Sequence, residues 1–183
     1  MELRTIIDIP RQRPFTISHD RGIVMLGSCF TDNIGQRLER DGFDVTYNPM
    51  GTLYNPASVS NALSLALSDP SERRLMTRKD ADEKWHCLNF AARYLYDTRE
   101  EMEADINAQL DSLAEKVRDC STIFITLGTS YVFHLGDEGI VGNCHKFPAE
   151  TFIRRRLSIS EIVDEWGEIL RMLLVRYPGM RVI

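Results

Sequence analysis

The turn Gly27-Ser28-Cys29 is the first stretch of the chain whose residue types fit a chemical role. It follows a short apolar run, 23–26, and precedes a segment in which Ile34 and Leu38 stand four apart among polar residues. The run is too short for a helix and predicts a buried strand, whereas the later spacing predicts an amphipathic helix. Ser28 is therefore expected at the carboxyl end of a strand, immediately before a helix.

A serine in that position suits nucleophilic attack on a carbonyl group. Open α/β sheets bind ligands at the carboxyl ends of their strands, and a helix N-terminus offers N–H groups and partial positive charge to an oxyanion. Cys29 is a rival nucleophile, since a helix N-terminus lowers a thiol's pKa. The simpler alternative is that Ser28 only caps the helix.

Two further loops are expected at the same edge of the sheet. Acyl transfer by a serine requires a nucleophile, donors for the oxyanion and a base. Ser28 supplies the nucleophile and one N–H group, and Gly51 supplies a second N–H because glycine lets a substrate approach closely. Thr129 or Ser130 adds a hydroxyl or amide donor. Three such loops predict an oxyanion hole.

Four histidines are candidates for the base: His145, His134, His86 and His19. His145 is favoured because it lies in a polar loop beside Lys146. The alternative is that His145 only hydrogen-bonds the backbone or a substrate, without transferring a proton. No His, Cys or Asp spacing fits a metal site, so neither a metal nor another cofactor is expected.

The elements that must position these residues follow from periodicity and turn signals. Strands alternating with helices predict a mainly parallel sheet covered on both faces, in a single α/β domain spanning 1–183. The segment 71–97 is the least clear, with an extended stretch expected at 85–90. The remaining elements are expected as strand 23–26, helix from about Thr31 to Gly42, strand 43–47, helix 58–67, a helix capped at Thr98, strand 121–127, a hairpin of 131–135 with 140–141, a helix capped at Ser158, and a strand from Met180.

Composition excludes several classes of function. The 183 residues carry a formal net charge of −5, which argues against nucleic acid as a partner. No apolar run is long enough to span a bilayer, so no membrane association is expected. The four cysteines show no paired spacing and predict reduced thiols in a cytoplasmic protein. The chain ends as a strand begins, which suggests that it is truncated.

At the level of motifs, the chain resembles the GSCFA family. Thr31 stands where the family's name has Ala. The resemblance covers most of the chain, and the motifs that carry it are Gly27-Ser28-Cys29-Phe30, Asn48-Pro49-Met50-Gly51-Thr52-Leu53-Tyr54-Asn55-Pro56, Leu127-Gly128-Thr129 and Asn143-Cys144-His145-Lys146.

The GSCFA family is in turn similar to SGNH/GDSL hydrolases, which implies a flavodoxin-like, three-layer fold with a small β-hairpin insertion. It implies Ser28 as the nucleophile, with Cys29 buried, and Gly51 as an oxyanion donor. Ser130 replaces the asparagine that usually gives the third donor. No late Asp-x-x-His motif is present, so the base is either His145 or a histidine beyond the last strand. The motifs also imply substrate contacts from Asn48, Asn55, Asn143 and Lys146.

These observations predict a serine esterase or acyltransferase that acts on a small-molecule or carbohydrate ester. The alternative is a non-catalytic domain that binds a glycan or acyl group in the same cleft, and a third reading is a purely structural or oligomerising domain. The run Arg154-Arg155-Arg156 either meets an anionic substrate or is a solvated face. The oligomeric state is left open.

Overall fold

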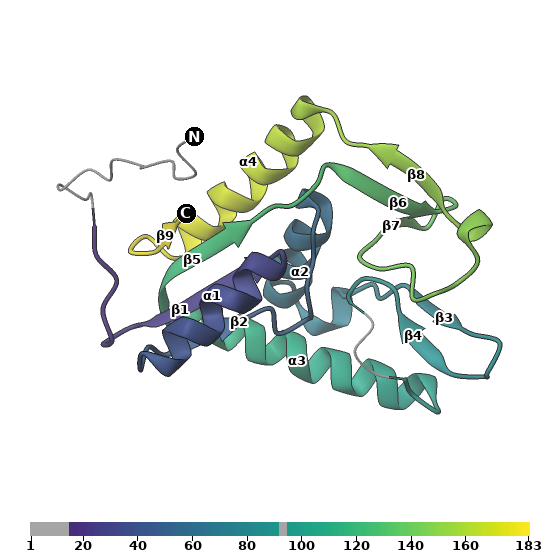
Figure 1. Cartoon of the computed structure of the whole chain (residues 1–183), viewed down its shortest axis with the longest axis horizontal. Coiled ribbons are helices and arrows are strands. Elements are labelled where there is room, and N and C mark those ends of the chain that lie inside the picture. Colours follow the sequence, from purple (N-terminus) through teal and green to yellow (C-terminus); the bar gives the residue numbers. More distant parts are fainter. Residues whose placement is uncertain (1–14, 92–94) are drawn as a thin grey trace, which may run out of the picture.

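The computed structural model describes residues 15–91 and 95–183 (Figure 1). The four helices of this part are α1 (Cys29–Arg40), α2 (Pro56–Leu67), α3 (Arg99–Asp119) and α4 (Ile159–Arg176), with short 3-10 turns at Pro70–Glu72 and Ala149–Thr151. The strands are β1 (Gly22–Gly27), β2 (Val45–Tyr47), β3 (Thr77–Lys79), β4 (Trp85–Cys87), β5 (Cys120–Thr126), β6 (Tyr131–Leu135), β7 (Gly139–Val141), β8 (Ile153–Arg156) and β9 (Arg181–Val182).

A parallel sheet in the order β2-β1-β5-β9 forms the centre of the molecule. The pairings of β1 with β2 and β5, and of β5 with β9, are all parallel. The four residues from Ile23 to Leu26 are each at most 2% exposed, because a strand between two neighbours and beneath helices is buried on both sides. The prediction of a mixed α/β fold with a mainly parallel central sheet is therefore confirmed.

The helices pack against this sheet and against one another. Helix α1 lies over β1 and β2, and α2 contacts both α3 and α4. Gly35 of α1 sits so close to β2 that an added Cβ would lie 2.4 Å from the Tyr47 ring. The main hydrophobic core joins alternate residues of β1, such as Val24 and Leu26, to the inner faces of α2, α3 and α4.

Two small antiparallel sheets lie beyond the central one. Strands β6 and β7 pair as neighbours, but β8 also pairs with β6, so the order is β7-β6-β8 where a two-stranded hairpin was expected. The segment 71–97, unclear from sequence, contains the pair β3–β4. Charged residues of β3 concealed its strand character, because an exposed edge strand need not alternate with apolar residues.

Helix starts differ slightly from the prediction for local reasons. Helix α1 begins at Cys29 rather than near Thr31. Helix α2 begins at Pro56 because the Asn55 side chain accepts a hydrogen bond from the Ser58 N–H, 2.8 Å away, and proline suits a first helical position. The caps expected at Thr98 and Ser158 both accept from the N–H three residues later.

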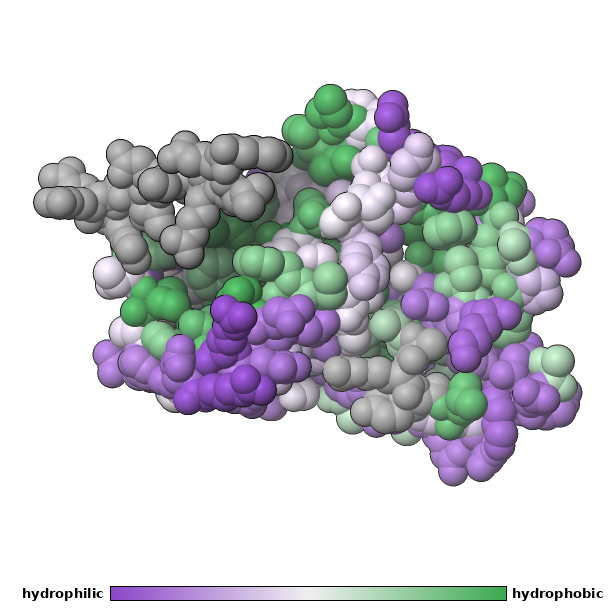
Figure 2. Space-filling view, viewed as in Figure 1, coloured by the Kyte–Doolittle hydropathy of each residue, from purple (hydrophilic) through white to green (hydrophobic). Residues whose placement is uncertain are grey.

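The surface separates by polarity in the view of Figure 2. Hydrophilic side chains cover α1, and apolar ones gather at the start of α4, where Ile159 and Val163 are exposed. Weakly polar side chains form a pale band over the end of β5 and the start of β6. Within residues 15–91 and 95–183, no helix combines the length and apolar character that a membrane span requires.

Candidate functional site

Three loops meet at the carboxyl end of β1, as the sequence predicts. The Leu53 N–H donates to the Gly27 carbonyl at 2.9 Å, which joins the 48–55 loop to the β1 turn. The Gly128 N–H donates to the Tyr54 carbonyl at 2.8 Å, which joins the loop after β5 to the same segment. A Cβ at Gly128 would lie 3.6 Å from the Ser28 Cβ. Ser28 is therefore enclosed by all three connections.

The Ser28 side chain does not cap the helix that it precedes. Ser28 is the N-cap residue of α1, yet its hydroxyl makes no capping hydrogen bond. The hydroxyl instead lies 3.0 Å from the Thr126 hydroxyl at the end of β5, and the residue is half-buried. The simple capping interpretation is therefore wrong, and the hydroxyl is held at the rim of the sheet by a neighbouring strand.

Thr126 organises the hydrogen bonds around that hydroxyl. Its Oγ1 accepts from the Ser28 N–H at 3.0 Å and lies 2.7 Å from the Thr31 hydroxyl. A hydroxyl has one proton and two lone pairs and can therefore make three hydrogen bonds. The Ser28 N–H, the Ser28 hydroxyl and the Thr31 hydroxyl together use all three at Thr126. If Thr31 donates to Thr126 and Thr126 donates to Ser28, the Ser28 proton stays free to leave toward a base.

The Asn48 side chain stabilises the turn through hydrogen bonds. It is 1% exposed, and its Oδ1 accepts from the Gly27 N–H at 2.8 Å. Its amide nitrogen donates to Asp32 at 2.8 Å and to the Ser28 carbonyl at 3.3 Å. Thr52 donates to the other Asp32 oxygen at 2.8 Å. Asn48 thus builds the turn instead of making the substrate contact expected from the motif.

The amide groups expected to form the oxyanion hole already have acceptors. The Ser28 N–H donates to the Thr126 carbonyl at 2.9 Å, the Gly51 N–H to the Asn48 carbonyl at 2.8 Å, and the Thr129 N–H to the Tyr54 carbonyl at 3.0 Å. The Thr129 hydroxyl also accepts from the Tyr131 N–H. These groups are committed to holding the loops together, which corrects the expectation.

Other donors remain beside Ser28. Cys29 and Phe30 occupy the first two positions of α1, where a backbone N–H has no acceptor within the helix. The next N–H, that of Thr31, donates to the Ser28 carbonyl at 2.9 Å. The Ser130 hydroxyl is half-buried and has no hydrogen-bond partner among the described residues. An oxyanion near Ser28 would therefore meet the start of α1.

The rival nucleophile Cys29 is exposed rather than buried, contrary to expectation. Partial burial, followed by the Cys29 sulfur, raises the pKa of the Tyr54 phenol, so this phenol stays protonated at neutral pH. The Ser28 hydroxyl faces Thr126, 3.0 Å away.

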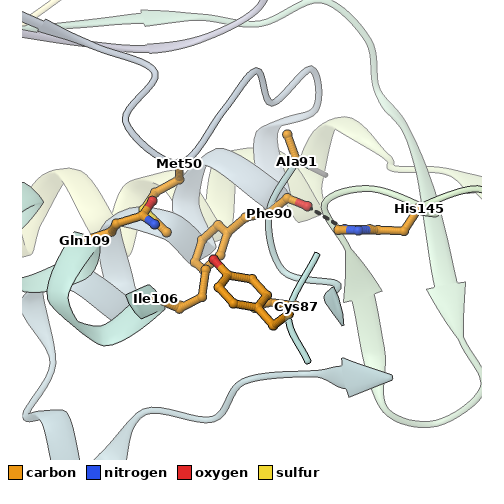
Figure 3. A pocket seen from close by; sticks show the side chains of 8 residues that line it. Met50, Cys87, Phe90, Ala91, Ile106, Gln109 and His145 are labelled. Carbon is orange, nitrogen blue, oxygen red and sulfur yellow. Dashed lines mark hydrogen bonds between the residues drawn. The ribbon is translucent and has the colours of Figure 1, made fainter. Parts of the chain in front are cut away.

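His145 does not contact Ser28. It is 7% exposed and follows β7 in the loop that carries the Asn143-Cys144-His145-Lys146 motif. Its Nε2 lies 2.9 Å from the Phe90 carbonyl, beside a small hollow also lined by Met50 and Ile106 (Figure 3). Its Nδ1 lies 3.1 Å from the Nδ1 of His86. Both ring nitrogens are thus engaged, so His145 is not the expected base in this arrangement.

The hydrogen-bond partners of His145 and His86 indicate which of their ring nitrogens carry protons. The Phe90 carbonyl only accepts, so the Nε2 of His145 carries hydrogen. Burial lowers the pKa of His145 and favours its neutral form, in which Nδ1 can accept from His86. The other nitrogen of His86, Nε2, lies 2.7 Å from Asp80. The hydrogen bond from His86 lowers the pKa of Asp80, so this carboxylate also needs a donor. His145 is therefore the neutral acceptor of the pair.

Stability is expected to fall as pH falls below the ordinary histidine value. Burial lowers the pKa of His145 from 6.5, so below pH 6.5 the unfolded chain binds a proton that the folded chain resists. Folding stability therefore decreases from pH 6.5 down to the folded pKa, by at most about 1.4 kcal/mol per pH unit. Urea unfolding at pH 7.5 and 5.5 measures the loss, and His145→Gln should reduce it. An equal loss in His145→Gln would contradict the assignment.

The remaining candidates have local structural roles. Asn55 caps α2, and the Asn143 side chain accepts from the His145 N–H at 2.8 Å. His134 accepts from Arg155 at 2.9 Å, and His19 stacks on Phe43 at 3.9 Å between ring centroids. Lys146 is exposed and remains available to a ligand.

Thr126 is the site residue that sequence reasoning missed. Its position within the predicted strand 121–127 was visible, but β-branched residues are common in strands. Nothing in the sequence marked its hydroxyl as a partner of Ser28. Across 15–91 and 95–183, no cluster of three metal-binding side chains occurs, and all four cysteines are free thiols.

Comparison with known proteins identifies the family. The model of the GSCFA family matches residues 22–183, and the chain therefore belongs to this family. Neither the curated proteins nor the solved structures contain a match. The family match includes each of the three loops around Ser28.

Proposed function

Starting from membership of the GSCFA family, we propose that this chain is a serine-dependent hydrolase or transferase of acyl esters, similar to SGNH/GDSL hydrolases. The observation that carries the proposal is the Ser28 hydroxyl, which precedes a helix without capping it and is held 3.0 Å from Thr126. A helix cap would explain a serine at this position without any chemistry, and that explanation fails here.

In the proposed reaction, Ser28 Oγ attacks the ester carbonyl and its proton passes to a base. The oxyanion accepts hydrogen bonds from the N–H groups of Cys29 and Phe30, whose helix end favours negative charge. The Ser130 hydroxyl adds a donor. The alkoxide leaving group takes up a proton as the acyl-serine forms, and water or an alcohol then releases the acyl group.

The proposed reaction also needs a general base that takes the proton of the Ser28 hydroxyl. No imidazole or carboxylate of 15–91 or 95–183 hydrogen-bonds the Ser28 hydroxyl, whose partner is Thr126. A positioned base contributes about 10²- to 10⁴-fold to such reactions. We therefore expect this chain to hydrolyse p-nitrophenyl acetate slowly, and added imidazole to accelerate the Ser28-dependent part by supplying the missing base.

The test compares wild type with Ser28→Ala and Ser130→Ala, with and without imidazole. Ser28→Ala should remove the protein-dependent rate and its response to imidazole. Ser130→Ala should retain both, with a rate lowered by about 10²-fold, the smaller of the effects typical for loss of one oxyanion donor. A protein-dependent rate that survives Ser28→Ala unchanged would eliminate the nucleophile assignment.

The absence of a hydrogen-bonded base also favours a second candidate, a domain that binds a glycan or acyl group without turning it over. This candidate predicts saturable ligand binding in both wild type and Ser28→Ala. It also predicts no covalent labelling of Ser28 by a fluorophosphonate. The two functions are therefore separated by covalent reaction at Ser28 and not by binding.

A further inference from the structure

Strand β6 presents two aromatic rings on one face. Tyr131 and Phe133 are 41% and 38% exposed, whereas Val132 between them is fully buried. Alternate residues of a strand point to the same face, so the two rings lie side by side. In the register with β8, Tyr131 stands opposite Arg156 and Phe133 opposite Arg154. These four residues form one surface, here called the aromatic–arginine face.

The two arginines of this face keep their charge available. The Arg154 guanidinium stacks 3.9 Å from the centre of the Tyr131 ring, a geometry that leaves its N–H edges free. Within the described residues, neither Arg154 nor Arg156 pairs with a carboxylate. Arg155, on the opposite face, behaves differently, since it donates to Glu161 at 2.7 Å. A chain of net charge −5 thus concentrates two uncompensated cations here.

This face begins close to Ser28. A Cβ added at Gly128 would lie 3.6 Å from the Ser28 Cβ, and Tyr131 is three positions further along the chain, a reach of at most about 10 Å. The Leu157 N–H donates to the Ser130 carbonyl at 2.8 Å, which fastens the end of β8 to the same loop. Figure 1 shows β5 passing the start of α1 and leading directly into β6. A ligand lying along β6 would therefore extend toward the serine.

The chemistry of the face indicates what occupies it. Aromatic rings have a negative face that attracts the partly positive C–H groups of a sugar ring, and guanidinium groups bind carboxylates through paired N–H bonds. We propose that the aromatic–arginine face binds a carboxylate-bearing carbohydrate chain and brings an ester on that chain to Ser28. Binding of the acidic carbohydrate is inferred from the four residues of the face, and only the reaction of its ester at Ser28 rests on the proposed function.

The binding test uses Ser28→Ala protein, so that turnover does not enter. The probe is an oligomer of galacturonate, compared with the same oligomer in its methyl-esterified form, which lacks the carboxylate charges. Titration calorimetry should show binding of the acidic oligomer that weakens with added salt. Arg156→Gln and Tyr131→Ala should each weaken it about tenfold, whereas Arg171→Gln, an exposed arginine of α4, should not.

Equal affinity for the esterified oligomer, or no binding of the acidic one, would overturn the inference. Tighter binding of oligo(dT), lost in Arg156→Gln, would also overturn it, because the face would then serve nucleic acid. Wild type and Arg171→Gln should hydrolyse p-nitrophenyl acetate at the same rate. If Ser28 is inert while binding is Arg156-dependent, only the proposed function fails; if Ser28 reacts while binding is absent, only this inference fails.

Discussion

Gly27→Ala is expected to destabilise the chain by more than about 4 kcal/mol, an exceptional loss for one methyl group. Gly27 has φ of +133° and an alanine Cβ there would lie 2.0 Å from the Thr126 carbonyl oxygen. The backbone cannot retreat, since the Gly27 N–H is bonded to Asn48 and the Ser28 N–H to Thr126. The clash separates β1 from β5, the central pair of the sheet.

Urea unfolding followed by tryptophan fluorescence measures this loss against a matched control. Gly167, in α4, has no heavy atom within 4 Å of an added Cβ. Gly167→Ala should therefore stabilise the protein by up to about 1 kcal/mol through helix propensity. Because typical domains unfold with about 5–15 kcal/mol, Gly27→Ala leaves the chain largely or wholly unfolded. A Gly27→Ala protein within 1 kcal/mol of wild type would refute the described turn.

Asn48→Ala is expected to cost about 3 kcal/mol and to abolish the Ser28-dependent reaction. The substitution leaves the buried Gly27 N–H without its acceptor, which costs about 1–3 kcal/mol. Asn48 also has φ of +40°, a conformation that asparagine tolerates better than alanine. The Asp32 carboxylate loses a donor as well. The turn that presents Ser28 thereby loses its support from the 48–55 loop.

Two companion variants make this prediction specific. Asn33→Ala removes an exposed asparagine of α1 that bonds only the Cys29 carbonyl, and it should change the unfolding free energy by less than about 0.5 kcal/mol. Asn48→Asp keeps an acceptor for Gly27 but places a carboxylate against Asp32, so it should be more stable at pH 5 than at pH 8. An Asn48→Asp protein equally stable at both pH values would contradict the contact with Asp32.

The central sheet could be predicted from sequence because its signals are local. The apolar run before Gly27 and the β-branched run before Gly128 both proved to be strands, β1, which is buried, and β5, which is buried in part. The cap at Ser158 fixed the start of α4. The small sheets were harder, since β3 consists of Thr77, Arg78 and Lys79, and its strand conformation depends on pairing with β4 and not on its own pattern.

For the candidate site, the sequence predicted only that three loops would meet at one edge of the sheet. Which atoms remain free depends on tertiary hydrogen bonds that no spacing reveals. The Gly51 N–H is used by the Asn48 carbonyl, and the partner of Ser28 comes from Thr126, 98 residues later. His145 has the residue type of a base, but the β4 segment supplies His86 and Phe90 as its partners.

The most direct test of the account is where a fluorophosphonate reacts with the protein. Wild type is incubated with the probe and imidazole, digested, and analysed by mass spectrometry for the modified residue. The account predicts a single adduct on Ser28, formed faster with imidazole and absent from Ser28→Ala. An adduct on another residue in place of Ser28, or no adduct under either condition, would contradict it.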